Sequence, residues 1–124
     1  MLENMELRLK VLNMDNGPYD TDEEIIGSIV EKQSGNYALG YISETGGFIP
    51  KYVGRGNVHD RLIDHLSDEY NQPMFKFSYA KNEKEAYTKE CKNYHDYKNQ
   101  LLNKEHPKLP DGIQCPYCSH IGVS

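Results

Sequence analysis

The sequence predicts a single α/β domain of the α+β kind, in which a small, mostly antiparallel β-sheet is built on a central hairpin and flanked by helices. Three observations lead to this fold class. The length of 124 residues suits one domain with one core. Two β-prone runs, 37–43 and 48–53, are separated by a short stretch that contains Gly46 and Gly47, which is typical of a hairpin. Apolar residues recur at helical spacing on both sides of that hairpin.

The N-terminal quarter is expected to contain a strand followed by a short helix. Residues 7–11 alternate apolar and basic side chains, which is the two-residue period of a half-buried strand, and the polar stretch 13–20 ends it. Thr21 and Glu24 have the spacing of a capping box, and β-branched residues then recur at helical spacing. We therefore predict a helix over 22–33 and an N-terminal strand at an edge of the sheet.

The other elements are predicted by proline and asparagine residues at particular positions and by the alternation of apolar side chains. Pro50 lies inside the second hairpin strand, so we expect an edge strand or a bulge there, because proline donates no ladder hydrogen bond. Asn57 can cap a helix with one apolar stripe. Residues 74–79 alternate again and predict a strand. Asn82 can begin a long polar helix that reaches about Leu102, after which prolines predict a loop.

The net charge of −5 is unevenly distributed along the chain. Residues 1–34 contain 3 basic and 8 acidic side chains, whereas 35–124 contain 11 of each. Strong nonspecific affinity for DNA is therefore not expected, although a body of zero net charge can present a basic face. The candidates for such a face are Lys51, Arg55, Arg61, Lys76, Lys81 and Lys84.

We expect neither a membrane span nor a secretory signal peptide in this sequence. No stretch approaches the ~20 apolar residues that a membrane span requires. The N-terminus lacks the basic and apolar regions of a secretory signal peptide. We therefore expect a cytoplasmic protein with no membrane contact.

Short motifs occur in a fixed order on the predicted hairpin and beyond it. Gly35-Asn36-Tyr37 begins the first hairpin strand, and Tyr52-Val53-Gly54 ends the second. The chain then offers, in order, Arg61 and His65 on the next helix, Glu90 on the long helix and Asn103 after it. Taken together, these residues resemble the motifs of the GIY-YIG nuclease domain family. The resemblance covers roughly residues 35–107.

The resemblance implies a fold, an activity and a set of site residues. The catalytic set that it implies consists of Tyr37, Tyr52, Arg61, His65, Glu90 and Asn103. By analogy with the family, Tyr37 takes the proton of the attacking water with help from His65. Tyr52 then positions the phosphate, and Asn103 helps to hold the site.

These residue types also suit phosphodiester hydrolysis on chemical grounds. Arg61 carries a permanently charged fork that fits phosphate geometry, and it shares a helix face with the residue four positions later. Glu90 can hold hydrated Mg²⁺ or Mn²⁺, since such ions bind through one or two carboxylates and the substrate phosphate. A tyrosine is a poor base unless cations lower its pKa, and we expect Arg61, Arg55 and the metal to do so. The expected substrate-binding residues are Arg55, Gly54 and Lys51.

Two departures from the family pattern affect the first motif. Asn36 stands where the family usually has an apolar residue, and the interval between Tyr37 and Tyr52 is longer than usual. Tyr41 is therefore an alternative for the first-motif tyrosine. Since positions 37 and 41 differ by four, both lie on the same face of a strand. Gly35 favours Tyr37.

A second site is indicated by three cysteines, an odd number that fits a disulfide framework poorly. Cys115 and Cys118 form a knuckle that can provide half of a tetrahedral Zn²⁺ site. Cys91 and His95 lie one helical turn apart on the long helix and can complete the site by folding the tail back. The alternatives for the fourth ligand are His120 and His106. We expect this zinc to be structural.

The sequence thus predicts a divalent-metal-dependent endonuclease that hydrolyses DNA, with an acidic strand-helix extension (1–34), a catalytic core (35–107) and a zinc-knuckle tail (108–124). The alternative is a catalytically silent, zinc-stabilised module of the same fold that binds nucleic acid or protein. RNA stays open as a substrate, because the site reads phosphate rather than sugar. A catalytic domain this short is expected to gain affinity from a partner protein or from a homodimer.

Overall fold

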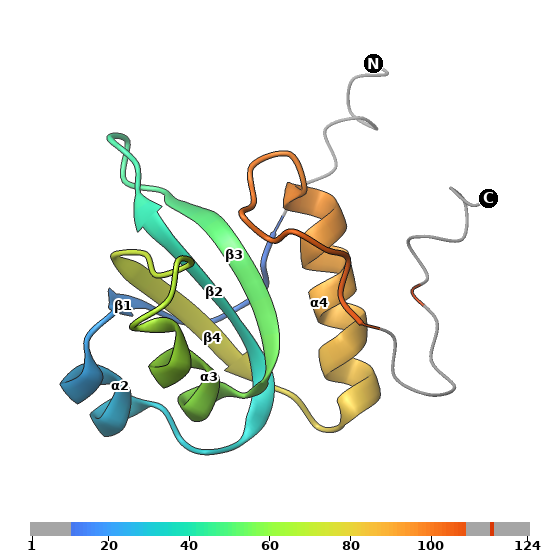
Figure 1. The fold of residues 1–124 in the computed structure, drawn as a ribbon, viewed down its shortest axis with the longest axis horizontal. Coiled ribbons are helices and arrows are strands. Elements are labelled where there is room, and N and C mark those ends of the chain that lie inside the picture. Colours follow the sequence, from blue (N-terminus) through green and yellow to red (C-terminus); the bar gives the residue numbers. More distant parts are fainter. Residues whose placement is uncertain (1–10, 109–114, 116–124) are drawn as a thin grey trace.

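The computed structural model describes residues 11–108 and Cys115. Within these residues, three helices pack on a four-stranded antiparallel sheet with the strand order β1-β4-β2-β3, which confirms the α+β prediction (Figure 1). The strands are β1 (Asn16–Asp20), β2 (Ser34–Ile42), β3 (Phe48–Asn57) and β4 (Met74–Tyr79). The helices are α2 (Glu23–Ile29), α3 (Val58–His65) and α4 (Glu83–Tyr97).

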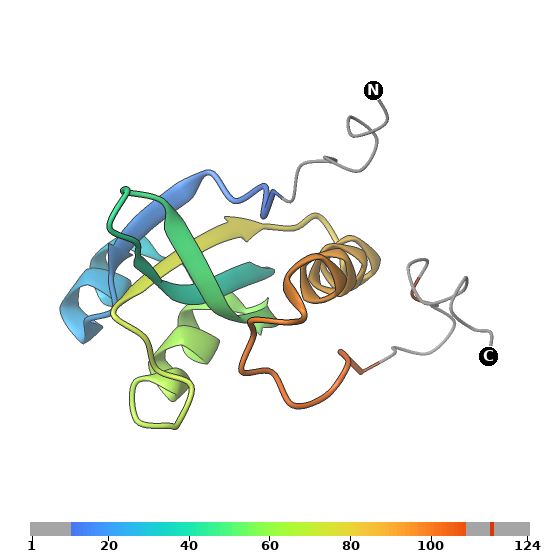
Figure 2. The ribbon, with the colours of Figure 1, turned by 90° about the horizontal axis from the view of Figure 1, so that it is seen from above.

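The sheet separates two groups of helices. Helices α2 and α3 lie on one face and α4 lies on the other (Figures 1 and 2). Side chains of β2 alternate between these faces, because successive residues of a strand point to opposite sides. Tyr37 and Leu39 belong to the core beneath α2 and α3, whereas Ala38 packs with residues of α4.

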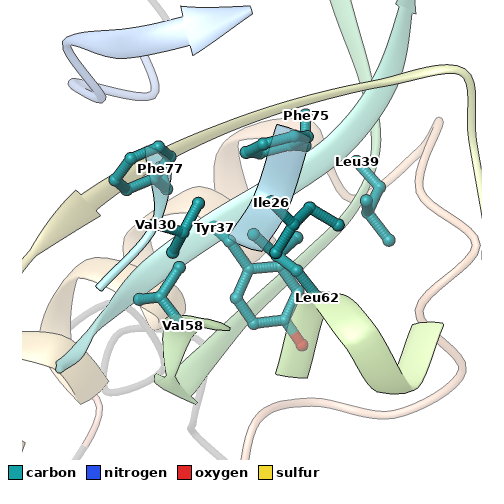
Figure 3. Close-up of a cluster of buried hydrophobic side chains, with 8 residues drawn as sticks. All are labelled: Ile26, Val30, Tyr37, Leu39, Val58, Leu62, Phe75 and Phe77. Atoms are coloured by element: carbon teal, nitrogen blue, oxygen red, sulfur yellow. The ribbon is translucent and has the colours of Figure 1, made fainter. Parts of the chain in front are cut away.

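The larger core cluster contains the first-motif tyrosine. Figure 3 shows the Tyr37 ring among apolar side chains, with its oxygen directed away from Phe75 and Phe77. Burial of each large apolar side chain contributes roughly 1.5–3 kcal/mol to folding. The aromatic ring of Tyr37 is therefore part of the hydrophobic core, whereas its hydroxyl group is polar and points out of the cluster. The cluster consists of Ile26, Val30, Tyr37, Leu39, Val58, Leu62, Phe75 and Phe77.

Helix α2 begins and ends differently from the prediction. Asp22, not Thr21, caps it, since the Asp22 carboxylate accepts hydrogen bonds from the backbone N–H groups of Glu24 and Ile25 at 3.0 and 3.2 Å. The helix stops at Ile29 instead of continuing to 33. Val30 is extended and enters the core, which turns the chain towards β2.

The first strand of the described chain is also shifted from the prediction. The stretch 13–20 was expected to break regular structure, yet it contains β1, which pairs with β4 at the edge of the sheet. The predicted strand at 7–11 lies outside the described residues, except for Val11, which is not in a strand. Pairing with an existing sheet edge thus overrides the turn-forming composition of this segment.

The hairpin, β4 and the starts of the two later helices confirm the sequence predictions. Pro50 lies in the edge strand β3, next to a bulge, because Leu39 pairs with Tyr52 while Gly40 pairs with Pro50. Asn57 caps α3, and Asn82 caps α4. Helix α4 ends at Tyr97 rather than near Leu102. Among the described residues, none of the helices is long and apolar enough to cross a membrane.

Candidate active site

Tyr37 lies near the middle of β2, and its position depends on the glycine two residues before it. A Cβ on Gly35 would overlap the backbone of β4 at Ser78 and Tyr79. Glycine therefore lets β2 and β4 approach closely. The ring of Tyr37 is 1% exposed, and its hydroxyl lies 2.8 Å from Nε2 of His65.

The unusual polar residue of the first motif faces the opposite side of the sheet. Asn36 is buried, and its Nδ2 donates a 2.8 Å hydrogen bond to the carbonyl oxygen of Ala86 in α4. Asn36 therefore joins β2 to the helix that carries Glu90. Asn36, which departs from the family pattern, therefore has a structural role on the face of the sheet that α4 covers.

The second motif lies on β3, beside Tyr37. The rings of Tyr37 and Tyr52 are stacked, with their centroids 6.3 Å apart. A Cβ on Gly54 would overlap the phenol of Tyr37, so the glycine leaves room for that ring. Tyr41, the alternative first-motif tyrosine, is 41% exposed and is not among the residues of the cleft described below.

Helix α3 contributes an arginine and a histidine to the same place. His65 is 2% exposed, and its ring centroid lies 5.4 Å from that of Tyr37 and 4.8 Å from that of Tyr52. Arg61, one turn earlier, lines the cleft and forms an ion pair with Asp64 at 3.2 Å. Both residues lie in α3, one helical turn apart, and both act on the hydroxyl of Tyr37.

Glu90 reaches the site from the other face of the sheet. It is 8% exposed and forms an ion pair with Arg55 of β3. Burial raises the pKa of Glu90, and the Arg55 guanidinium opposes this effect. Arg55 also donates a 3.2 Å hydrogen bond to the carbonyl oxygen of Lys108. Arg55 thus links the carboxylate to the segment that follows α4.

The protonation of the tyrosines differs from the sequence expectation. We expected nearby cations to lower the pKa of Tyr37, but burial raises it well above the usual value, and the Arg61 guanidinium opposes only part of this effect. Burial also raises the pKa of Tyr52. Among the protein's own groups, desolvation of the phenolate therefore outweighs the nearby arginine charge at both tyrosines.

These side chains surround a cleft of about 590 Å³. Its lining includes Tyr37, Tyr52, Gly54, Arg55, Arg61, Glu90 and Asn103 from the predicted set. Lys51 is not among the lining residues, and its carbonyl oxygen accepts a hydrogen bond from Leu102 N–H. His65 lies behind Tyr37 rather than in the lining.

Asn103 attaches the segment after α4 to β3. Its Oδ1 accepts a 3.0 Å hydrogen bond from Val53 N–H, and its Nδ2 donates a 2.8 Å hydrogen bond to the Val53 carbonyl oxygen. The amide side chain therefore pairs with β3 as a neighbouring strand would. This contact holds residues 103–108 as one wall of the cleft.

Sequence reasoning missed three polar or aromatic residues at the site. Tyr70 lines the cleft and its ring centroid lies 4.6 Å from that of Tyr52. Lys104 lines the cleft and bonds to Glu69 at 3.1 Å. Asp68 contacts the His65 ring at 2.8 Å. Asp68 follows His65 by three positions, which is a signal that the sequence contained.

A cysteine and histidine group lies beside this site. Cys91, His95, His106 and Cys115 offer ligand atoms that all lie within 4.8 Å of one another, so the group could hold a metal ion. The sequence predicted three of these residues as ligands and His106 as an alternative. Cys118 and His120 lie outside the described residues.

The two cysteines of this group form a disulfide, which corrects the sequence prediction of two thiolate ligands. Cys91 and Cys115 are bonded across 24 positions. The sequence predicted Cys91, Cys115 and Cys118 together as thiolate ligands, because an odd number of cysteines fits a disulfide framework poorly. A disulfide sulfur carries no thiolate charge, so this group can take up zinc only in the reduced state.

Comparison of the chain with protein-family models, curated proteins and solved structures gave no match.

Proposed function

We propose that the protein is a divalent-metal-dependent endonuclease that hydrolyses DNA phosphodiester bonds in the cleft between α3, β3 and α4. One observation carries the proposal: side chains from four separate elements lie together at this cleft. Along the chain, these residues follow one another in the order that the GIY-YIG resemblance implies. They are Tyr37 of β2, Tyr52 of β3, Arg61 of α3 and Glu90 of α4, with His65 behind Tyr37.

The chemistry of each residue suits phosphoryl transfer. Arg61 and Arg55 bring two permanent positive charges to the cleft, where they can bind the two non-bridging phosphate oxygens. Tyr52 is half-buried beside Tyr37 and offers its hydroxyl to the phosphate. Mg²⁺ or Mn²⁺ bound at Glu90 would stabilise the charge that develops on the phosphate. Glu90 lines the cleft together with Tyr52 and both arginines, so its carboxylate lies in the same cavity that would hold the phosphate.

Cleavage of supercoiled plasmid and of branched DNA with Mg²⁺ or Mn²⁺ tests the proposal. We expect Glu90→Gln and Arg61→Ala to lower the rate by at least about 100-fold, because each removes charge that stabilises the transition state. Glu83→Gln is the matched control, since Glu83 is exposed in the first turn of α4 and does not line the cleft. Retained activity in both cleft variants would refute the assignment, provided that circular dichroism shows native folding.

The main alternative is a catalytically silent module that binds nucleic acid or protein. The observation in its favour is the ion pair between Glu90 and Arg55, which engages the carboxylate that a metal ion requires. In that case the wild type binds a fluorescent DNA or RNA duplex but cuts no substrate with either metal. Arg61→Ala and Arg55→Ala would then weaken binding, whereas Glu90→Gln would not.

For the cysteine and histidine group, the proposed ligand set in the reduced protein is Cys91, His95, His106 and Cys115, and the proposed metal is a structural zinc ion. Two thiolates and two imidazoles form a donor set that tetrahedral Zn²⁺ prefers. Cys91 is fully buried and its Sγ lies 3.4 Å from Nε2 of His106. Such a site would join α4 to residues 103–108, which form one wall of the cleft.

A further inference from the structure

A continuous hydrogen-bonded chain of side chains runs from the cleft to the protein surface. The Tyr37 hydroxyl lies 2.8 Å from Nε2 of His65, and Nδ1 of His65 lies 2.8 Å from Oδ2 of Asp68. Tyr37 lines the cleft, whereas the side chain of Asp68 is 37% exposed to solvent. One buried imidazole therefore connects the two ends.

The carboxylate at the outer end sets the direction of this chain. A carboxylate can only accept hydrogen bonds, so the contact with Asp68 requires the ring proton of His65 on Nδ1. In a neutral imidazole, Nε2 then has a free lone pair and accepts from the Tyr37 hydroxyl. The geometry thus selects the tautomer of His65 that can receive a proton from Tyr37.

Tyr37 needs a proton acceptor because its own hydroxyl is protonated. Burial raises the pKa of Tyr37, so the residue is a neutral phenol at neutral pH. A neutral phenol can take a proton from water only if it gives up its own proton in the same step. Arg61, which also acts on this hydroxyl, has no acceptor lone pair. His65 is the acceptor, and burial lowers its pKa, which keeps the ring neutral.

We infer that Asp68 is a positioning residue, which orients His65 as the acceptor of a proton relay that begins in the cleft at Tyr37. The inference rests on the proposed nuclease function. As the water oxygen bonds to phosphorus and the bond to the leaving oxygen breaks, the water proton passes to the Tyr37 oxygen. The Tyr37 hydroxyl proton passes to Nε2 of His65, and the imidazolium is stabilised by the Asp68 carboxylate. The ring then loses a proton to solvent, and the leaving oxygen takes one from solvent.

Other titratable or charged groups face the relay from several elements, and the test must separate their charge from the hydrogen bond. They are Arg61 and Asp64 on α3, Tyr52 on β3, Tyr70 in the loop after α3, and Glu90 on α4, which acts on Tyr37. Among the described residues, Asp68 alone bonds to Nδ1 of His65. Substitution of Asp68 is therefore expected to change the tautomer of His65, whereas substitution of the more distant charged groups is not.

The test compares Asp68→Asn with Asp60→Asn in the full chain. Asp60 is a matched control because it lies on α3 and also bonds to a histidine ring, that of His59, at 2.9 Å. An asparagine at 68 can keep the 2.9 Å bond from Tyr70 N–H through Oδ1 and donate from Nδ2 to the His65 ring. That donor drives the ring proton from Nδ1 to Nε2.

The first readout is the imidazole ¹⁵N spectrum, which reports the tautomer of His65. We expect the Nδ1–H form in the wild type and in Asp60→Asn, and a shift towards the Nε2–H form in Asp68→Asn. Backbone amide spectra show whether each variant is folded. If a folded Asp68→Asn protein keeps the Nδ1–H form, Asp68 does not orient the ring and the inference is wrong.

The second readout is the pH dependence of plasmid cleavage. We expect Asp68→Asn to be about 10- to 100-fold slower at neutral pH, and Asp60→Asn to keep the wild-type rate. Asp68 raises the pKa of His65, so its removal should move the acidic loss of activity to lower pH. Unchanged rates and an unchanged pH profile would overturn the relay while leaving the nuclease assignment intact. A wild type that cuts nothing, with a tautomer that responds to Asp68, would instead overturn the nuclease assignment.

Discussion

The missing side chain of Gly54 allows Tyr37 to point into the cleft. Gly54 lies on the edge strand β3, and a Cβ there would overlap the ring and oxygen of Tyr37. Tyr37 can therefore occupy this position only because Gly54 has no side chain that would fill the same space. This dependence explains why a tyrosine of one strand requires a glycine of the next.

Gly54→Ala tests this dependence at the residue scale. We expect a loss of about 1–3 kcal/mol in the free energy of unfolding, measured by urea denaturation, because the added methyl group overfills the site. Cleavage should fall as well, since the Tyr37 hydroxyl must move away from His65. Gly27→Ala is the control: it lies in α2, a Cβ there has nothing within 4 Å, and helix propensity predicts stabilisation by up to about 1 kcal/mol. Equal stability of the two variants would contradict this account of the motif.

The sequence indicated that the motif glycines and tyrosines lie on the two hairpin strands, but it did not indicate their environment. The raised pKa of Tyr37 reflects burial among residues of α2, α3 and β4, which lie up to 40 positions away in the chain. Local sequence contains no information on such desolvation. The contact between Asp68 and His65 was visible as a spacing of three, yet only the fold shows that the ring is buried.

At the scale of secondary structure elements, the segment after α4 behaves as an additional edge of the sheet. Asn103 bonds to both backbone groups of Val53, and Gln100 donates a 2.9 Å hydrogen bond to the Pro50 carbonyl oxygen. These contacts cover part of the exposed edge of β3. They also bring residues 103–108 to the cleft.

Asn103→Ala and Gln100→Ala separate the two consequences of this docking. We expect Asn103→Ala to lower the free energy of unfolding by about 1–3 kcal/mol, since it leaves a partly buried N–H and C=O without their side-chain partner. Gln100→Ala removes one hydrogen bond and should cost about 0.5–1.5 kcal/mol. Denaturation curves measure both effects. Plasmid cleavage should fall only in Asn103→Ala. An equal fall in Gln100→Ala would mean that the cleavage rate does not depend on the attachment of the segment next to the cleft.

At the scale of the whole molecule, the two faces of the sheet contribute different parts of the site. Tyr37, Arg61 and His65 come from the side of α3, whereas Glu90 comes from α4 on the other side. They meet across β3 where its glycines leave space. The position of α4 relative to the sheet is therefore critical for the site. The cysteine and histidine group joins α4 to the segment that forms the cleft wall.

Metal content of the reduced protein tests the proposed role of this group. We expect one zinc ion for each chain after purification with a thiol reductant, loss of that zinc in His106→Ala, and its retention in Cys118→Ala. The reason is that His106 completes a four-ligand set with three residues within 4.8 Å. Elemental analysis measures the zinc. Removal of the zinc by a chelator, followed by removal of the chelator and return of Mg²⁺ or Mn²⁺, should lower both the melting temperature and the cleavage rate, because the cleft wall loses its attachment to α4.

The opposite pattern in the two variants would identify Cys118 as the fourth ligand, as the sequence alone favoured. His59→Ala provides the control for loss of a histidine, since His59 lies on α3 and is not part of the group. If the reduced wild-type protein binds no zinc, the metal proposal is wrong, and the disulfide between Cys91 and Cys115 is the role that the structure shows for these cysteines.

The sequence by itself determined the local features of this protein. Alternating and helical periodicities located the hairpin, β4 and the helices, and asparagine caps located the starts of α3 and α4. These features depend on side chains a few positions apart, so a short window of sequence is sufficient to identify them.

Only the tertiary structure decided which residues meet. It placed Tyr37 in the lining of the cleft, whereas Tyr41 is 41% exposed and lies outside that lining. It paired Cys91 with Cys115 and brought His106 to them, and it paired β1 with β4 where the sequence indicated a break. Each outcome depends on contacts between segments far apart in the chain. Burial, pKa and ligand geometry arise from such contacts, because they depend on which segments exclude water together.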